Sequence, residues 1–174
     1  MMFRNYLFLV YSLFLFCLQV KAAEQTYHLD GHEGNWTAFH YSHMKQQINS
    51  CHVLSNDLVL GFERDANNVG LILWDSKGKQ IPGRNKNIAL TINKEHFLFT
   101  MKAMDKNMLM NRLNLKDFNY LLQKLSYADL VVVEYGQQPV NIVDLLGLPS
   151  MLSKFNYCIS QAKFGFSEYE NHFP

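Results

Sequence analysis

The alternation of apolar and polar residues predicts β-strands over much of the chain. Ile88, Leu90 and Ile92 fall on one face of the chain, with Ala89 and Thr91 between them on the other. A period of two is typical of a strand with one buried face. Strands predicted from alternation, or from short apolar runs between turn residues, cover residues 36–43, 51–54, 58–62, 69–74, 88–92, 97–101, 130–135 and 140–145.

Two stretches instead have apolar residues three and four apart, which places them on one side of a 3.6-residue helix. The first covers residues 114–125 and begins at Asn114, a residue type that caps helices, with Asp117 at the third helical position. The second covers residues 148–159 and has Pro149 in its first turn, where the missing N–H costs nothing. The apolar positions are Leu115, Phe118, Leu121, Leu122, Leu125, Leu148, Met151, Leu152, Phe155 and Ile159.

A series of strands followed by a helix, two strands and a last helix predicts an α+β fold that is mainly β. The strands would form an antiparallel β-sandwich or a curled sheet, with the two short helices over one face or end. Residues 36–162 form one domain in this interpretation, since a mature chain of roughly 150 residues has the usual size of a single domain. The polar residues 23–35, which include Gly31 and Gly34, are predicted to form a flexible leader.

Residues 1–22 have the layout of an export signal. Arg4 supplies a positive charge, residues 6–18 are almost continuously apolar, and small residues precede a cleavage site after Ala22 or Ala23. The apolar core is short for a membrane span, although an uncleaved signal anchor is the alternative. We therefore expect an exported protein, periplasmic or extracellular, with no transmembrane segment after cleavage.

The charge of the mature chain argues against a nucleic-acid partner. Removing Arg4 and Lys21 from the 16 basic residues leaves 14 against 15 acidic residues, a formal charge of −1. A chain without a net basic field lacks the electrostatic footprint of a nucleic-acid-binding protein. The sequence gives no reason to expect a cofactor.

The cysteines indicate a disulfide bond. Cys17 lies inside the apolar core of the signal and would be removed with it, which leaves Cys51 and Cys158. In an oxidising compartment a single remaining pair is interpreted as a disulfide. Cys158 falls close to the apolar stripe of the second helix, so the bond would fasten that helix to an early strand. Two buried free thiols are the alternative.

The histidines offer weak candidates for a metal site. His28, Asp30 and His32 could place two imidazoles and a carboxylate around one ion. A polar, flexible leader is the other interpretation, and the chain has neither Cys-x-x-Cys nor His-Glu-x-x-His spacing. We therefore expect no metal.

Catalytic motifs are weak as well. The sequence Gly147-Leu-Pro-Ser150 lacks the Gly-x-Ser-x-Gly spacing of a nucleophile elbow. Cys51 and His52 are adjacent, but a strand directs adjacent side chains to opposite faces, and a cysteine held in a disulfide is no nucleophile. We therefore expect that the protein is not an enzyme.

Two surface features could contact a partner. A loop between strands gathers four basic residues that could attract an anionic lipid, glycan or protein, with a solvated hairpin as the alternative. The aromatic tail over residues 163–174 either packs back on the domain or presents an apolar segment to a partner. The candidate partner-binding residues are Lys77, Lys79, Arg84, Lys86, Phe164 and Phe166.

The order of the elements resembles a known family. Gly34-Asn-Trp36-Thr opens the first predicted strand, Cys51-His-Val follows, and hairpins, a short helix and a final pair of strands complete the domain. This pattern, over most of the mature chain, is similar to that of the invasion-associated locus B family of exported bacterial β-sandwich proteins. The chain departs from the family at Phe39-His40-Tyr41, where many members have a cysteine, and it lacks a further cysteine pair in the middle of the chain.

The resemblance implies a periplasmic or envelope location and a role in binding or host interaction, and it brings no catalytic residues. The first functional hypothesis is therefore a non-enzymatic exported protein that binds a protein partner. A periplasmic inhibitor or immunity protein that caps another protein's active site is the alternative, and a hydrolase with an unrecognised site is a third.

Overall fold

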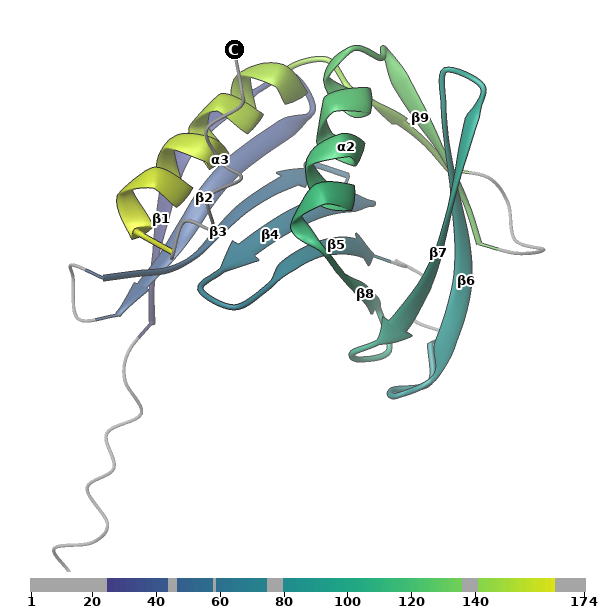
Figure 1. Ribbon diagram of the computed structural model, residues 1–174, viewed down its shortest axis with the longest axis horizontal. Coiled ribbons are helices and arrows are strands. Elements are labelled where there is room, and N and C mark those ends of the chain that lie inside the picture. Colours follow the sequence, from purple (N-terminus) through teal and green to yellow (C-terminus); the bar gives the residue numbers. More distant parts are fainter. Residues whose placement is uncertain (1–24, 44–46, 58, 75–79, 136–140, 165–174) are drawn as a thin grey trace, which may run out of the picture.

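The computed structural model describes residues 25–43, 47–57, 59–74, 80–135 and 141–164. These residues form one sheet of ten antiparallel strands and two helices, which confirms the prediction of a mainly β, α+β fold (Figure 1). The sheet curls, and both helices lie on its concave side. Of the two predicted arrangements, the curled sheet is therefore the one that forms. The strands are β1 (Gln25–Glu33), β2 (Trp36–His43), β3 (Gln47–Ser55), β4 (Leu60–Asp65), β5 (Val69–Trp74), β6 (Asn85–Ile92), β7 (Glu95–Ala103), β8 (Met108–Leu113), β9 (Leu130–Glu134) and β10 (Asn141–Asp144).

The strand order has two parts that meet at β5. Strands β1 to β5 lie side by side in sequence order, as expected of a meander joined by short connections. Beyond β5 the order is β8, β7, β6, β9 and β10, so that the chain crosses to β6 and then returns to β5 through β7 and β8. Every pairing is antiparallel.

The two predicted helices are confirmed. Helix α2 (Leu115–Ser126) begins after Asn114, whose side chain accepts a hydrogen bond from the Asp117 backbone N–H at 2.9 Å. Helix α3 (Leu148–Ala162) extends about one turn beyond the predicted end at residue 159. Among the described residues, no helix is both long enough and apolar enough to span a membrane.

The core lies between the curled sheet and the helices. Trp36 is fully buried, its ring stacks near Phe62, and its indole N–H donates to the Asp144 carbonyl at 2.9 Å. Phe118 of α2 packs against Phe62 and against Phe155 of α3. The apolar faces of both helices and the inner face of the sheet therefore form one continuous cluster.

The predicted bond between Cys51 and Cys158 is present. It joins the inner face of β3 to the third turn of α3 across a sequence separation of 107 residues, with the two Cα atoms 6.0 Å apart. Helix α3 lies across β1, β2 and β3, so the bond fastens it to the strands that it covers.

The β1–β2 turn contacts the connection between β10 and α3. The Asn35 N–H in the β1–β2 turn donates to the Leu146 carbonyl at 3.2 Å. Gly34 and Gly147 both have a positive φ, and a Cβ atom on either would collide with backbone of the other segment, namely the carbonyls of Leu146 and Glu33. Glycine is therefore required at both positions by conformation and by close approach.

The prediction of a flexible leader was wrong for residues 25–33, which form strand β1. This strand pairs with β2 along its whole length, with a bulge between Leu29 and Gly31. The polar composition was misleading because β1 is an edge strand whose polar side chains find partners on β2. The predicted export signal, residues 1–22, lies outside the described residues.

Candidate functional site

The outer face of β1 and β2, which points away from the helices, carries a cluster of aromatic rings. Trp36 and Ala38 of β2 point into the core, so strand alternation sends Phe39 and Tyr41 to the outer face. Tyr27 of β1 lies opposite Tyr41 in the register. Its ring centroid is 5.1 Å from that of Phe39 and 5.9 Å from that of Tyr41, which are distances of favourable aromatic packing.

His52 of β3 extends this cluster across a third strand. Its imidazole stacks on Phe39 with a centroid distance of 4.9 Å and an interplanar angle of 6°, and meets Tyr41 edge-on at 5.4 Å. Tyr27 and Leu29, on the edge strand, remain 51% and 60% exposed. We call Tyr27, Leu29, Phe39, Tyr41 and His52 the outer-face cluster.

Two polar side chains, from β3 and β4, lie against the ring nitrogens of His52. A ring nitrogen of His52, Nε2, lies 2.8 Å from Ser50 Oγ, and its Nδ1 lies 3.9 Å from Glu63 Oε2. Burial lowers the pKa of His52 to about 4, against the opposing charge of Asp65. Burial, together with repulsion by Asp65, raises the pKa of Glu63, while Arg112 acts in the opposite direction. The imidazole is therefore neutral near pH 7, and its proximity to Glu63 is not an ion pair.

Ser50, His52 and Glu63 follow the order of a nucleophile, a base and an acid, but their geometry does not suit catalysis. The 3.9 Å between His52 and Glu63 is too long for the hydrogen bond that orients a catalytic imidazole. A base with a pKa of about 4 also accepts a proton weakly at neutral pH. The arrangement instead holds His52 neutral beneath the aromatic rings.

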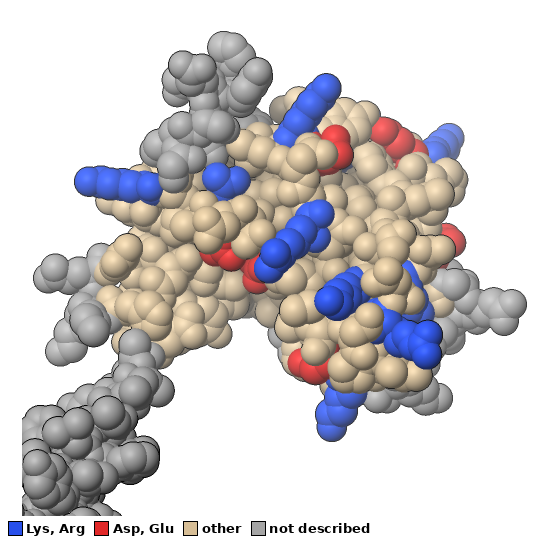
Figure 2. Space-filling model, turned by 60° about the horizontal axis from the view of Figure 1, so that its bottom comes forward, with Lys and Arg blue, Asp and Glu red and all other residues tan. Residues whose placement is uncertain are grey.

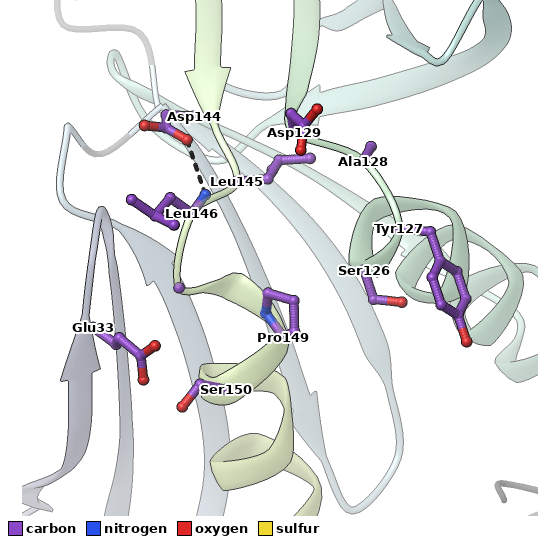
Figure 3. A pocket seen from close by; sticks show the side chains of 11 residues that line it. Glu33, Ser126, Tyr127, Ala128, Asp129, Asp144, Leu145, Leu146, Pro149 and Ser150 are labelled. Atoms are coloured by element: carbon purple, nitrogen blue, oxygen red, sulfur yellow. Dashed lines mark hydrogen bonds between the residues drawn. The ribbon is translucent and has the colours of Figure 1, made fainter.

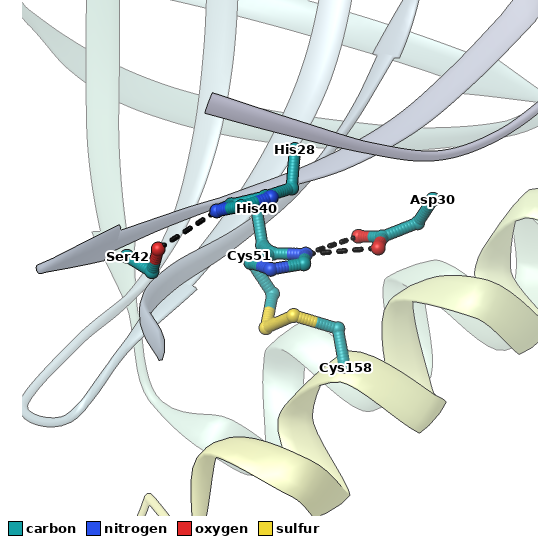
Figure 4. A network of polar contacts seen from close by, with 6 residues as sticks. All are labelled: His28, Asp30, His40, Ser42, Cys51 and Cys158. Atoms are coloured by element: carbon teal, nitrogen blue, oxygen red, sulfur yellow. Dashed lines mark hydrogen bonds and ion pairs between the residues drawn. A yellow bond between two sulfur atoms is a disulfide. The ribbon is translucent and has the colours of Figure 1, made fainter. Parts of the chain in front are cut away.

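The inner face of the same strands carries a second cluster, next to the disulfide (Figure 4). The His40 Nδ1 atom lies 2.8 and 2.9 Å from the two carboxylate oxygens of Asp30. His28 stacks on His40 at a centroid distance of 4.8 Å and bonds through Nε2 to the buried Ser42 hydroxyl at 2.9 Å. The register places His40 opposite Cys51 on β3.

The bulge in β1 explains how this inner cluster forms. His28 pairs with His40 and Gly31 pairs with Ala38, so Asp30 is the extra residue of β1. A bulge re-aims a side chain, and here it leaves the Asp30 carboxylate against His40.

The three predicted metal candidates do not gather around one point. His28 and Asp30 both lie against His40, which was not among the three candidates. His32 instead bonds to the Thr37 hydroxyl at 3.1 Å, beside the β1–β2 turn. The prediction missed His40 because its proximity to Asp30 depends on the strand register.

An open cavity of about 790 Å³ lies between the β1–β2 turn, the loop after α2 and the start of α3 (Figure 3). Glu33, Asp129 and Asp144 bring three carboxyl groups to its lining, and Ser150 is also present. The Asp144 carboxylate accepts a hydrogen bond from the Leu146 N–H at 2.9 Å, so it also shapes the connection into α3. The cavity is acidic and open.

The predicted basic loop is only partly described. Arg84 is exposed and Lys86 is half-buried, with its ammonium 5.4 Å from the Tyr135 ring centroid. Lys77 and Lys79 lie outside the described residues. The register of β6 and β7 adds Lys102, opposite Asn85, to the same end of the hairpin. Figure 2 shows basic side chains gathered on one part of the surface, toward the lower right of the view.

The aromatic tail divides into two parts. Phe164 is only 4% exposed and belongs to the core, so this side chain packs back on the domain and is not free to contact a partner. Phe166 lies outside the described residues.

The chain matches no protein-family model, no curated protein and no solved structure. The resemblance to the invasion-associated locus B family therefore stays a prediction.

The outer-face cluster was not predicted from the sequence. Its signal is present, since Tyr27 and Leu29 alternate with polar residues, as do Phe39 and Tyr41. The prediction of a leader over residues 23–35 excludes the strand that carries Tyr27 and Leu29, and so it conceals the cluster.

Proposed function

We propose that this protein is exported and acts, without catalysis, by binding a protein partner through the outer-face cluster. The observation that carries the proposal is the exposure of Tyr27 and Leu29, at 51% and 60%, beside rings already packed against one another. Tyrosine is enriched at protein interfaces, and contiguous apolar surface on a soluble domain marks an interaction site. Rings held by their neighbours lose little conformational freedom on binding.

The geometry favours a protein over a flat ligand such as a sugar ring. The ring of Phe39 is covered on one side by His52, and the planes of Tyr27 and Tyr41 are inclined at 65°. These rings therefore offer no common plane for stacking. Strand β1 also pairs only with β2 among the described strands, so an extended segment of a partner could hydrogen-bond along its other edge.

The bulge limits where such a segment would bind. Residues 25–29 of β1 are in regular register with β2, and the register shifts after Leu29. A partner strand would therefore pair beside residues 25–29, with its outward side chains next to Tyr27 and Leu29. The layout of residues 1–22 and the disulfide both support export, to the periplasm or the cell exterior, and the family resemblance supports host interaction as the setting.

The proposal can be tested by photo-crosslinking in cells that naturally produce the protein. A photoreactive residue at position 29 should give a discrete protein adduct, because Leu29 would lie in the interface. The matched control places the same residue at position 98, since Leu98 of β7 is 81% exposed and lies on a different part of the sheet.

A second change ties the adduct to the outer-face cluster. Tyr27→Ala should weaken binding of the captured partner at least about tenfold, because truncation of a hot-spot aromatic residue costs about 2 kcal/mol or more and each 1.4 kcal/mol is about tenfold. Purified variants and partner would be compared by calorimetry, with Tyr127→Ala as control because Tyr127 is 80% exposed elsewhere. Equal adducts at positions 29 and 98, or affinity unaffected by Tyr27→Ala, would contradict the proposal.

A further inference from the structure

Four groups with metal-binding chemistry converge between the sheet and helix α3 (Figure 4). A carboxylate oxygen of Asp30, a ring nitrogen of His40 and Sγ of Cys158 all lie within 4.8 Å of one another. The fourth group is Cys51, bonded to Cys158. The four residues come from β1, β2, α3 and β3, so no two of them share an element.

The disulfide occupies the sulfur atoms, because the metal ligand is a thiolate. Reduction would release two thiols, both almost fully buried, beside an imidazole and a carboxylate. In a tetrahedral zinc site with Zn–S bonds of about 2.3 Å, two sulfur atoms lie about 3.8 Å apart. Cα atoms 6.0 Å apart are compatible with this separation.

We propose that reduction of the Cys51–Cys158 bond converts this cluster between the sheet and α3 into a site for one divalent transition-metal ion of the Zn²⁺ class. Cys51, Cys158, His40 and Asp30 are its ligands. Two thiolates, an imidazole and a carboxylate make the donor set that Zn²⁺ accepts in proteins. The ion would replace the covalent bond as the link between β3 and α3.

The surroundings of His40 suit this role. His28 stacks on its ring and is itself held by Ser42, which restricts the orientation of the imidazole before any ion arrives. Asp30 lies in the bulge of the edge strand with its side chain 22% exposed, which gives an ion a path from solvent. Fixed orientation of ligands by their neighbours strengthens metal binding.

The chemistry balances with a dithiol as the reductant. The S–S bond between Cys51 and Cys158 breaks and takes two electrons and two protons from the dithiol, which becomes a cyclic disulfide. Binding of Zn²⁺ then displaces the two thiol protons to solvent as two Zn–S bonds form. Metal binding is therefore excluded by oxidation and favoured by rising pH.

The test uses the mature chain, reduced with dithiothreitol under argon and then freed of the reductant. Zn²⁺ content is measured after gel filtration, and Co²⁺ is added as a spectroscopic probe. We expect one Zn²⁺ per reduced chain, none in the oxidised chain, and Co²⁺ spectra with thiolate charge-transfer bands and the intense visible bands of a tetrahedral site. Circular dichroism with and without Zn²⁺ follows the fold of the reduced chain.

Two variants separate this site from simple binding by cysteines. His40→Phe keeps the ring that stacks on His28, and Asp30→Asn keeps the shape of the bulged side chain, but both remove a ligand. Each should weaken Zn²⁺ binding at least tenfold, whereas His32→Phe, beside the turn, should have no effect. Failure of the reduced chain to bind Zn²⁺, folded or unfolded, would overturn the proposal, as would an affinity that depends on the cysteines but not on His40 and Asp30.

Discussion

The two halves of the curled sheet differ in the kinds of side chain that they carry. In the half formed by β1 to β4, the inner face carries imidazoles, a carboxylate and the disulfide, and the outer face carries aromatic rings. In the half formed by β6, β9 and β10, the fully buried strand residues are all aliphatic. These aliphatic residues are Ile88, Leu90, Ile92, Val131, Val133 and Val143.

The difference shows where the chemistry of this molecule lies. The aliphatic half needs only burial to hold it, and its buried residues belong to the same core as Leu121 and Leu125 of α2. The other half places polar groups beneath α3 and is fastened to it covalently. Both proposed binding sites lie in the half formed by β1 to β4. Three experiments test how far the stability of the fold depends on the disulfide, on His52 and on the close contact at Gly147.

The largest effect should come from the disulfide. Replacing Cys51 and Cys158 together by alanine should lower the free energy of unfolding by about 4.7 kcal/mol, because the bond closes a loop of about 100 residues in the unfolded chain. Urea unfolding of the wild type in the presence of a reductant should show the same loss, and the double variant should not respond to the reductant. A loss below about 1 kcal/mol would mean that α3 is held by packing alone.

The second effect is a dependence of stability on pH that originates at His52. Its pKa is about 4 in the folded chain, below the ordinary value of 6.5 for histidine, so the unfolded chain binds the proton more readily. The stabilisation is therefore complete above pH 6.5 and is lost as the pH falls toward 4, by about 3 kcal/mol. His52→Phe keeps a ring against Phe39 and should remove this loss in unfolding experiments between pH 7 and 4.

Glu63 provides the matched control for that measurement. Its pKa is raised, so its contribution to stability is lost as the pH rises above 4.5, which opposes the effect of His52. Glu63→Gln should therefore make stability fall more steeply as the pH decreases from 6.5. Identical pH profiles for the wild type and His52→Phe would contradict the assignment.

The smallest effect concerns the contact between the β1–β2 turn and the connection from β10 to α3. Gly147→Ala should reduce the free energy of unfolding by about 2 kcal/mol more than Gly83→Ala, measured by urea unfolding. Both glycines have a positive φ, at 91° and 82°, but only a side chain at position 147 meets other backbone, while nothing lies within 4 Å of one at position 83. Equal losses would show that the backbone conformation, and not the approach of Glu33, sets the requirement for glycine.

The features that depend on neighbouring residues in the sequence were predicted correctly. The spacing of Leu121, Leu122 and Leu125 predicted α2, and Asn114 predicted its start. Both signals lie within a few turns of sequence, because a helix is defined by its cap and by its apolar face. The pairing of Cys51 with Cys158 followed from the count of cysteines and the expected compartment. These features need no knowledge of distant strands.

The pairing of β5 with β8, and the meeting of Asp30 with His40, depend on register between separate strands. No local pattern specifies such a register, so the contact between Asp30 and His40 could not be derived from the sequence. Strand β1 was missed for a related reason. Its polar residues are stabilised by His40, Ser42 and Thr37 on β2, and they resemble a leader when that strand is not considered.

The position of the last helix has a consequence for how the molecule is made. Residues of α3 cover β1, β2 and β3, and Leu146 completes the hydrogen bonding of the first hairpin. During synthesis the earliest strands must therefore wait, uncovered, until the carboxyl-terminal residues have emerged. Such a high contact order slows folding, and the bond between Cys51 and Cys158 can form only after α3 has been synthesised.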